Sequence, residues 1–436
     1  MSYIGRTPTS KALYERARKT IPGGATYSVR YFEPYPVYIS RARGSRVWDV
    51  DGNEYIDFWM AHFAALLGHG YPAVVEAVKE QLELGAHVGY CNEWEVKWSE
   101  SVCRWFGADR VKPANSGTES NMYAVRLARA STGKKLVAKA EGGWHGGSNG
   151  LHKAVNYPYE KPAAAGLPRT QDTLAIPFND IEGSSKALRR DDVACVLVEP
   201  VLSAAGEIPA DREYLKGLRE ICDERGALLI FDEVVTGFRH PGGLQAFYGV
   251  KPDLTTLGKT VGGQYFAGAG GFCGRADVMD MLDQTKVKSF WERPFLGGTY
   301  TGNPLNMRAG YVVISELERR KDEVFPHLDT LGELIRRRLV EAIEERKVQA
   351  YVTGIMSVFG IHFTKERPVS GATAERTKLL DAHRALHRHM LEGGILYLTP
   401  ASPHLALSAA HTQEDVEKFV SVFAAFLDGF GSSGDR

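Results

Sequence analysis

The sequence has no excess of charge of either sign, because 53 lysine and arginine residues balance 53 aspartate and glutamate residues in a chain of 436. This balance gives no electrostatic basis for binding nucleic acid or an anionic membrane. No apolar run approaches the roughly 18 residues that cross a bilayer, and residues 1–6 lack the apolar core of a signal peptide. We therefore expect a soluble, cytoplasmic protein that acts on small molecules, with no nucleic-acid or membrane partner.

Cysteine is scarce as well. The five cysteines are scattered and show no C-x-x-C spacing, which is typical of reduced thiols and not of disulfides or zinc sites. Histidines such as His62, His69 and His145 do not have the spacing of metal ligands on a helix. We expect no metal site.

Apolar strands and amphipathic helices are abundant, and they indicate three regions along the chain. Asp51-Gly52 between alternating apolar residues predicts a hairpin, so we expect residues 1–65 to form an N-terminal arm and a small antiparallel sheet. Helix and strand patterns alternate from about residue 70, and long charged helices follow after about residue 305. We assign residues 66–310 to a large domain and residues 311–436 to a C-terminal small domain.

Two apolar runs in the large domain, residues 193–198 and 227–231, are joined by a predicted helix. Nearly continuous apolar strands connected in this way predict a parallel sheet that is buried on both faces. Each run is followed by an acid, Glu199 and Asp232 respectively. Because ligands of open parallel sheets bind beyond the carboxyl ends of the strands, both acids lie at the expected edge of a site.

Lys259 ends the segment PDLTTLGK, downstream of the strand that leads to Asp232. A lysine amine can form a Schiff base with an aldehyde, and a buried carboxylate can keep a pyridine nitrogen protonated, so this pair indicates a pyridoxal phosphate site. The alternative for Lys259 is a solvated surface lysine. A nucleotide-binding P-loop is disfavoured, because Asp253 stands where that motif requires its first glycine.

Residues 115–121, with the sequence NSGTESN, precede a predicted helix. Free backbone N–H groups at the helix start, the hydroxyls of Ser116 and Thr118, and close approach at Gly117 together predict a phosphate cradle. Ser116 and Glu119 also have the spacing of a capping box. Both interpretations stay open, because a capped helix can still bind phosphate.

Four further residues are candidates that each have an ordinary structural alternative. Trp144, which precedes His145 in the loop GGWHGG, can stack on a planar cofactor or cover the core. Val234 points to the same side of its strand as Asp232 and can pack on the other ring face or belong to the core. Arg30 lies among aromatic residues and can bind a carboxylate, although surface arginines are commoner. Thr299 offers a hydroxyl in a glycine-rich turn.

Taken together, these segments resemble class III pyridoxal phosphate-dependent aminotransferases, and within that family the glutamate-1-semialdehyde 2,1-aminomutases. The similarity extends over nearly the whole chain in ordered blocks, which makes it specific. The blocks are residues 21–24, 28–30, 48–53, 115–119, 198–201, 231–239, 252–259, 298–304 and 410–412.

The resemblance implies the α/β architecture of fold type I, with a large domain built on a mainly parallel seven-stranded sheet flanked by helices and a smaller α+β domain. It also implies pyridoxal 5'-phosphate as cofactor and an obligate homodimer with the active site between subunits. Lys259 and Asp232 would be catalytic, the first binding the cofactor covalently and the second pairing with its ring nitrogen. The other residues that the resemblance places at the cofactor are Ser116, Gly117, Thr118, Trp144, His145, Glu199, Val234 and Thr299. Thr299 would reach the phosphate bound by the neighbouring subunit. The residues that the resemblance places at the substrate are Ser28, Arg30 and His62.

These features lead to the hypothesis of an aminotransferase that moves an amino group between an amino acid or amine and an oxo acid or aldehyde. A 2,1-aminomutase is the close alternative and a racemase the next, because all three reactions use the same catalytic residues. Ala204 stands where the aminomutases have an asparagine, which favours the aminotransferase. A non-catalytic protein that binds pyridoxal phosphate is disfavoured because Lys259 and Asp232 are both present.

Overall fold

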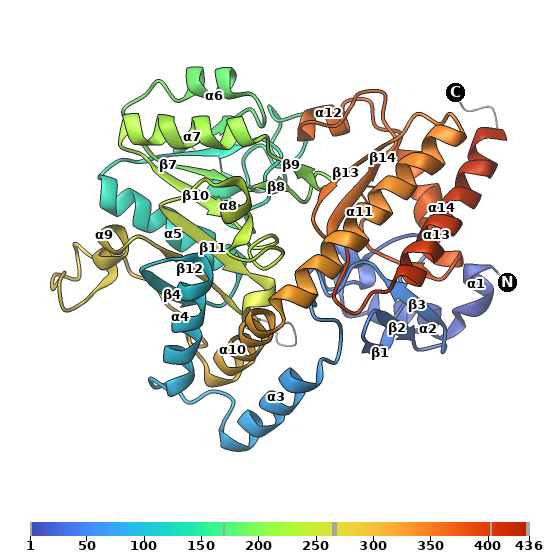
Figure 1. The fold of residues 1–436 in the computed structure, drawn as a ribbon, viewed down its shortest axis with the longest axis horizontal. Helices are drawn as coiled ribbons and strands as arrows, with labels where there is room; N and C mark the ends of the chain where they lie inside the picture. The colour runs from blue at the N-terminus through green and yellow to red at the C-terminus, as the bar shows by residue number, and fades with distance from the viewer. Residues whose placement is uncertain (1, 169–170, 264–267, 402, 433–436) are drawn as a thin grey trace. The chain divides into compact units, whose positions relative to one another are not determined.

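The computed structural model describes residues 2–168, 171–263, 268–401 and 403–432. Their contacts divide the chain into two compact units, which we call the terminal unit and the middle unit (Figure 1). The terminal unit is Met1–Tyr71 with Pro326–Pro368 and Arg376–Arg436, and the middle unit is Pro72–Phe325 with Val369–Glu375. The three-part division into residues 1–65, 66–310 and 311–436 stays a prediction.

A seven-stranded sheet forms the centre of the middle unit. In spatial order its strands are β4 (Arg110–Ala114), β12 (Gly270–Gly274), β11 (Leu254–Gly258), β10 (Leu228–Asp232), β7 (Val193–Val198), β5 (Leu136–Ala140) and β6 (Thr173–Ile176). Only β12 runs antiparallel to its neighbours, and all other pairings are parallel. The structure therefore confirms the mainly parallel seven-stranded sheet, and it pairs the two predicted apolar runs directly.

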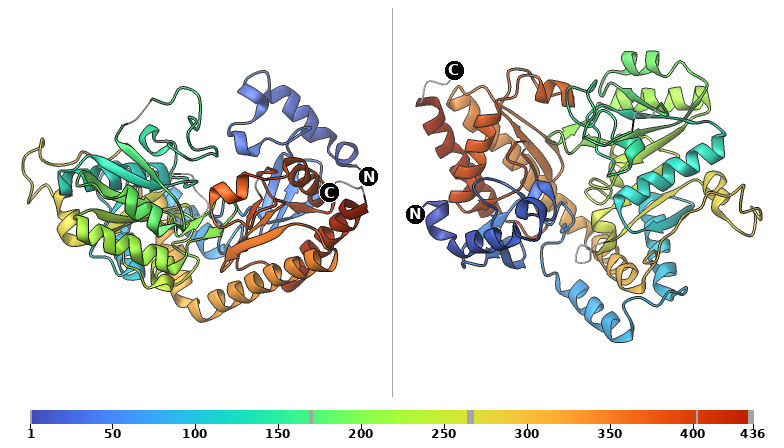
Figure 2. Two further views of the ribbon diagram at one scale, coloured as in Figure 1. Left: turned by 90° about the horizontal axis from the view of Figure 1, so that it is seen from above. Right: turned by 180° about the vertical axis from the view of Figure 1, so that it is seen from behind.

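Helices cover both faces of this sheet (Figures 1 and 2). Helix α5 contacts β7, β10, β11 and β12, and α7 contacts β7 and β10. The helices of the middle unit are α3 (Pro72–Leu84), α4 (Glu93–Phe106), α5 (Gly117–Thr132), α6 (Ile181–Ala187), α7 (Arg212–Arg225), α8 (Gly243–Tyr248), α9 (Ala276–Met279), α10 (Pro304–Arg319) and α12 (Gly371–Glu375). Its short elements are the 3-10 helices η3 (Asn149–Leu151), η4 (Lys259–Gly262) and η5 (Asp280–Leu282), and a hairpin of β8 (Val201–Leu202) and β9 (Ile208–Pro209).

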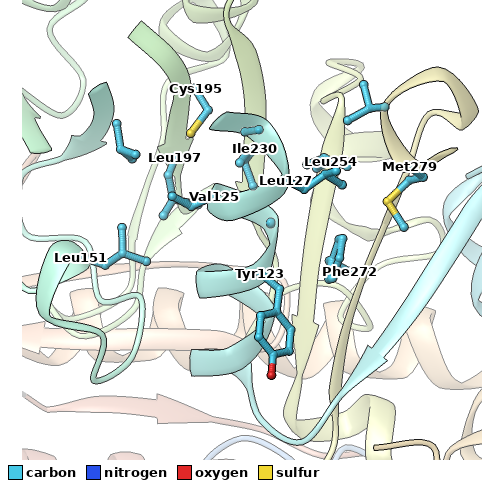
Figure 3. Close-up of a cluster of buried hydrophobic side chains, with 14 of the residues drawn as sticks. Tyr123, Val125, Leu127, Leu151, Cys195, Leu197, Ile230, Leu254, Phe272 and Met279 are labelled. Carbon is cyan, nitrogen blue, oxygen red and sulfur yellow. The ribbon is translucent and has the colours of Figure 1, made fainter. Parts of the chain in front are cut away.

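The apolar core beneath α5 fixes that helix against the sheet (Figure 3). Leu127 of α5 packs in one buried cluster with Leu197 of β7, Ile230 of β10 and Phe272 of β12. Full burial of one such side chain stabilises the fold by roughly 1.5–3 kcal/mol. The core therefore holds the first turn of α5 at a fixed place beside the carboxyl ends of the strands.

The terminal unit contains two small sheets and the remaining helices. Its four-stranded sheet has the order β1 (Ile39–Arg43), β2 (Arg46–Asp49), β3 (Glu54–Asp57) and β15 (Ile395–Leu396), and its three-stranded sheet has the order β13 (Tyr351–Ile355), β14 (Val358–His362) and β16 (His404–Ala406). Its helices are α1 (Tyr3–Arg6), α2 (Pro8–Ala17), η1 (Pro22–Gly24), η2 (Ser28–Arg30), α13 (Leu380–Glu392) and α14 (Gln413–Ser432), and α11 (Lys321–Glu345) contains the boundary between the units at Pro326.

The four-stranded sheet differs in one respect from the antiparallel sheet expected near the N-terminus. The predicted hairpin is present as β2 and β3, but β15 from the C-terminal part of the chain adds to β3 in parallel. A strand of two residues leaves no alternating pattern in the sequence, so this pairing could not be predicted. None of the helices described here is both long and apolar enough to cross a membrane.

Candidate active site

Asp232 and Lys259 lie at the carboxyl ends of two neighbouring parallel strands. Asp232 is the last residue of β10, Lys259 directly follows β11, and Asp232 is paired in register with Thr256 of β11. The structure thus places both residues at the edge of the sheet where the strand pattern predicts a ligand.

Three donors hold the buried carboxylate of Asp232. Its Oδ2 accepts hydrogen bonds from Nδ2 of Asn121 and Nδ1 of His145, both at 2.7 Å, whereas Oδ1 accepts only the backbone N–H of Val234 at 3.1 Å. Burial lowers the pKa of His145, so the neutral ring donates through Nδ1, and its buried Nε2 has no partner among the residues described. Since each carboxylate oxygen can accept two hydrogen bonds, Oδ1 retains capacity for one more donor.

Lys259 has the features of a reactive amine. It is a non-glycine residue with φ of 53°, a conformation that costs on the order of 1–3 kcal/mol and is concentrated at functional sites. Its side chain is partly exposed and makes no hydrogen bond to any residue that the structure describes. Burial of the amine lowers the pKa of Lys259, while the carboxylates of Asp232, Glu199 and Glu207 oppose the shift. A lowered pKa increases the neutral fraction, which is the nucleophilic form.

Glu199 connects the end of β7 to the loop that carries Trp144. Its carboxylate accepts the backbone N–H of Trp144 at 2.7 Å and that of Ser203 at 3.4 Å. Burial, and then the charge of Asp232, raise the pKa of Glu199 well above its ordinary value. Glu199 therefore contacts the backbone of the predicted stacking residue and fixes the position of that loop.

The first turn of α5 keeps the properties of the predicted phosphate cradle. Oγ of Ser116 caps the helix by accepting a hydrogen bond from the N–H of Glu119 at 3.2 Å, which confirms half of the capping box. The other half differs, because the carboxylate of Glu119 accepts the N–H of Asn115 and not that of Ser116. The N–H groups of Gly117 and Thr118 donate no hydrogen bond within the described chain, and both residues are half-buried. They are available to an anion at the positive end of the helix.

Close packing explains why position 117 is glycine. A Cβ atom at Gly117 would lie 3.0 Å from both methyl groups of Val234, so any side chain there would push Val234 away. Val234 is half-buried beside Asp232, but it lies in the turn after β10, which ends at Asp232, and not in the strand as expected. The structure therefore brings the predicted cradle and the predicted ring-packing residue together.

The loop of residues 142–147 touches the same helix start. The N–H of Gly147 donates to Oγ1 of Thr118 at 3.3 Å, and Gly146, with φ of 84°, packs so closely that a Cβ atom there would overlap Thr118. Trp144 is 36% exposed, and its ring meets His152 edge-on with centroids 5.0 Å apart. The indole is accessible to a planar ligand, as stacking requires.

A buried lysine that the sequence did not reveal binds backbone carbonyl groups of and near the loop of residues 142–147. Lys139 of β5 is fully buried, and its Nζ donates to the carbonyl oxygens of Gly143 at 3.0 Å and Lys153 at 2.8 Å. Burial lowers the pKa of Lys139 to about 7. Lysine is rarely buried, so neither composition nor periodicity pointed to this residue.

Four predicted residues are not brought to this cluster by a described contact. Thr299 is exposed, and its turn contacts the start of α5 through Thr301, whose Oγ1 accepts from Asn115 at 3.3 Å. The candidate substrate residues Ser28, Arg30 and His62 belong to the terminal unit. Their roles, like those of the cofactor residues, stay predictions.

The sequence analysis did not predict that Asn121 and Thr256 belong to the site. The sequence pattern around Asn121 could have indicated it, whereas the pattern around Thr256 could not. Asn121 lies on the apolar stripe of α5 that includes Ala124, Val125 and Ala128, and a polar residue on such a stripe marks a buried hydrogen bond. Thr256 lies in a β-strand, where threonine is common and attracts no notice.

The residues present fit pyridoxal phosphate. Asp232 keeps an acceptor oxygen for a ring N–H. Within the described residues, the amine of Lys259 has no hydrogen-bonding partner, and the helix start offers two unused N–H groups for a phosphate. No group of three or more potential metal ligands is found in the described part of the chain.

Comparisons with known proteins give the same picture. The sequence profile of the family described as aminotransferase class-III matches residues 27–423. The glutamate-1-semialdehyde 2,1-aminomutase of Methanopyrus kandleri is 38% identical over 438 residues, which cover 98% of this chain and 99% of that protein. An ω-transaminase from Sphaerobacter thermophilus has a TM-score of 0.90 at 33% identity, with 98% and 99% of the two chains covered. A transaminase solved with pyridoxal phosphate bound has a TM-score of 0.88 at 33% identity, with 99% of each chain covered.

Proposed function

The chain belongs to the class III aminotransferase family and is a pyridoxal phosphate-dependent enzyme, and from this premise we propose that it transfers an amino group from an amino acid or amine to a separate oxo acid or aldehyde. One observation carries the proposal: a partly exposed lysine and a buried, hydrogen-bonded carboxylate lie at the ends of adjacent parallel strands. This is the pair of groups that amino transfer needs.

The bound cofactor supplies an aldehyde that condenses with amines and a cationic ring that withdraws electrons from the reacting carbon. Asn121 and His145 hold Oδ2 of Asp232, and Oδ1 would accept the ring N–H and keep the ring positively charged. Lys259 would hold the aldehyde carbon of the cofactor, and its Nζ would move a proton between the substrate carbon and that cofactor carbon, which lie on either side of the transferred nitrogen.

The other predicted residues orient the cofactor. The N–H groups of Gly117 and Thr118 and the hydroxyl of Ser116 bind the phosphate. Trp144 and Val234 pack against the two ring faces, and Glu199 fixes the loop that carries Trp144 and His145.

Substitution of Lys259 tests the proposal most directly. Lys259→Ala should remove the visible absorption band of the bound cofactor and lower turnover by roughly 100-fold or more, which is the usual contribution of a positioned acid–base group. Lys251→Ala, which truncates an exposed lysine just before β11, is the matched control and should behave as the parent. Wild-type turnover in Lys259→Ala would refute the assignment.

A 2,1-aminomutase is the second candidate, and the identity of 38% to a named aminomutase over nearly the full length of both chains favours it. The two functions differ in their need for a second substrate. An aminotransferase consumes an amine and an oxo compound in ping-pong order, so turnover stops without the acceptor. Conversion of glutamate-1-semialdehyde without any added oxo acid would establish the aminomutase instead.

For the substrate we propose Arg30, Ser28 and His62 as binding residues. Arg30 is exposed, and among the described residues it donates to Oγ1 of Thr26 alone, at 3.0 Å, so its guanidinium has donors left for a carboxylate. His62 stacks on Tyr27 with centroids 5.7 Å apart, and it lies in a run, residues 60–63, in which all four residues have positive φ. Such strain in non-glycine residues is typical of functional segments. Arg30→Lys should raise KM for carboxylate substrates and leave KM for simple amines unchanged.

We also propose a homodimer, in which Thr299 serves the neighbouring subunit. Large aromatic side chains of the middle unit are exposed, including Trp291 at 93%, Tyr90 at 84% and Phe295 at 67%. Exposed apolar groups of this size indicate an interaction surface. Sedimentation equilibrium should show a dimer that Trp291→Ala weakens, and a parent that stays monomeric at micromolar concentration would exclude it.

We further propose a cytoplasmic location. All five cysteines are unpaired thiols, and Cys195, Cys222 and Cys273 are buried. Unpaired thiols are typical of a reducing compartment. Fractionation of the source cells tests the proposal, and recovery of the protein outside the cytoplasmic fraction would contradict it.

A further inference from the structure

Asn121 and Thr256 form a buried hydrogen-bonded pair behind Asp232. We propose that these two residues are positioning residues, which turn the carboxylate of Asp232 toward the cofactor ring and keep it charged. The inference rests on the proposed function, because it assigns Asp232 to the ring nitrogen. It adds two residues to the site that neither the motifs nor the family match single out.

The order of donors in this network is fixed by chemistry. The hydroxyl of Thr256 donates to Oδ1 of Asn121 at 2.7 Å, and Nδ2 of Asn121 donates to Oδ2 of Asp232 at 2.7 Å. A charged carboxylate only accepts, so the side-chain nitrogen of Asn121 must face it and the amide oxygen must face Thr256. The carboxylate of Asp232 thereby excludes the flipped amide, in which two oxygens would face each other, and the hydroxyl of Thr256 supplies the donor that the amide oxygen needs in the observed orientation.

Burial makes the arrangement rigid. Thr256 and Asn121 are at most 1% exposed, and Asp232 is 5% exposed. Water cannot replace either donor at such positions, so loss of the Thr256 hydroxyl leaves the amide oxygen of Asn121 without a donor, and loss of Asn121 leaves Oδ2 of Asp232 with His145 alone. Nδ2 of Asn121 also donates to the carbonyl oxygen of His145 at 3.4 Å, which joins the second donor of Asp232 to the same network.

The consequence for the carboxylate concerns both its direction and its charge. With Asn121 and His145 on Oδ2, the free capacity of the group lies on Oδ1, which accepts just the backbone N–H of Val234 among the described residues. Each donated hydrogen bond favours the charged carboxylate over the protonated acid. A charged Asp232 leaves the shared proton on the ring nitrogen, whereas loss of the donors moves that proton toward the carboxylate.

Thr255 provides a matched control on the same strand. Its side chain points to the opposite face of β11, where Oγ1 donates to Oε1 of Gln245 at 3.1 Å, and the residue is 3% exposed. Thr255→Val and Thr256→Val therefore remove the same hydroxyl from the same depth and leave the same kind of amide oxygen without a donor. Only the second change reaches Asp232.

The experiment measures purified protein loaded with pyridoxal phosphate, by two readouts that do not depend on turnover. These are the dissociation constant of the cofactor and the pH at which its visible band is replaced by its near-ultraviolet band. We expect Asn121→Leu to weaken cofactor binding by roughly tenfold, the equivalent of one hydrogen bond to a charged group, and Thr256→Val to weaken it by less. In both variants the pH of the spectral change should rise, because a less positive ring withdraws less charge. Thr256→Ser, which keeps the hydroxyl, should match the parent.

Equal spectral changes in Thr255→Val and Thr256→Val, or no change in Thr256→Val, would overturn the inference, because a general loss of packing would then explain the data. If Asn121→Leu does not fold, the comparison of Thr256→Val with Thr256→Ser and Thr255→Val decides alone. A parent protein that binds no pyridoxal phosphate would refute the proposed function itself, and the inference with it.

Discussion

Replacing Glu207 by glutamine should remove a decline in stability that the parent protein shows between about pH 4.5 and 8. Glu207 lies in the loop between β8 and β9, is completely buried and has φ of 57°. Its Oε2 accepts the hydroxyl of Ser203 at 3.3 Å, and its Oε1 has no partner in the described structure. Burial raises the pKa of Glu207 to about 8 from 4.5, against the opposing charges of Arg239 and Lys259.

The sign follows from proton binding. Between pH 4.5 and 8 the folded protein keeps the proton on Glu207 and the unfolded chain has lost it, so the folded state binds more protons and the unfolding free energy falls as pH rises. The contribution is fully present below pH 4.5 and is lost as pH passes 8. One pH unit inside this window is worth about 1.4 kcal/mol, so the whole window amounts to at most about 5 kcal/mol, and relaxation of the loop reduces it.

Urea unfolding of Glu207→Gln and the parent at pH 5 and pH 8, at one protein concentration, measures the effect. Glutamine resembles the neutral acid in shape and charge, so the two proteins should have similar stability at pH 5. At pH 8 the variant should be more stable by roughly 2–4 kcal/mol. Glu220→Gln, at an exposed position of α7, is the control and should follow the parent. Parallel pH profiles of Glu207→Gln and the parent would refute the reasoning.

Two further substitutions test the loop of residues 142–147. Lys139→Met should leave the carbonyl oxygens of Gly143 and Lys153 without their donor, which costs roughly 1–3 kcal/mol of stability for each. It should also abolish the gain in stability that we expect of the parent between pH 7 and 10.5, where the unfolded chain binds the proton that the folded protein has lost. Urea unfolding at pH 7 and 9.5 measures both effects, and an unchanged dependence of stability on pH would contradict the prediction. Gly146→Ala should destabilise the protein by roughly 1–3 kcal/mol and weaken cofactor binding, because the new methyl group would overlap Thr118 and φ at this position is positive. Gly147→Ala is the control, because no atom lies within 4 Å of its new methyl group. It should change neither thermal stability nor cofactor binding in the same assays.

The central chemistry could be predicted from the sequence because it depends on local patterns. A continuous apolar run followed by an acid predicts a buried parallel strand with a carboxylate at its functional end, and Asp232 lies there. Lys259 follows the next strand of the sheet, and the SGT segment starts a helix. Each of these features needs only a few consecutive residues to be recognised.

The supporting network could not be predicted, because its members are far apart in the chain. Asn121, His145 and Thr256 meet at Asp232 only after β5, β7, β10 and β11 have assembled beside α5. A buried Lys139 contradicts the composition rule that places lysine at the surface, and only its two carbonyl partners make it tolerable. Hydrogen bonds over such separations have no periodicity in the sequence.

The loop after Glu199 shows why the same chemistry can serve a different substrate. Ser203 donates its N–H to Glu199, which holds the Trp144 loop, and its hydroxyl to Glu207. The segment that carries Ala204, where the resemblance to the aminomutases implies an asparagine, is thus anchored to the cofactor site at Glu199 and ends in the buried acid Glu207. A change of this kind alters the surroundings of the reacting groups and leaves Lys259 and Asp232 where they are. A substitution in this loop therefore acts through a hydrogen-bonded unit and not through one side chain.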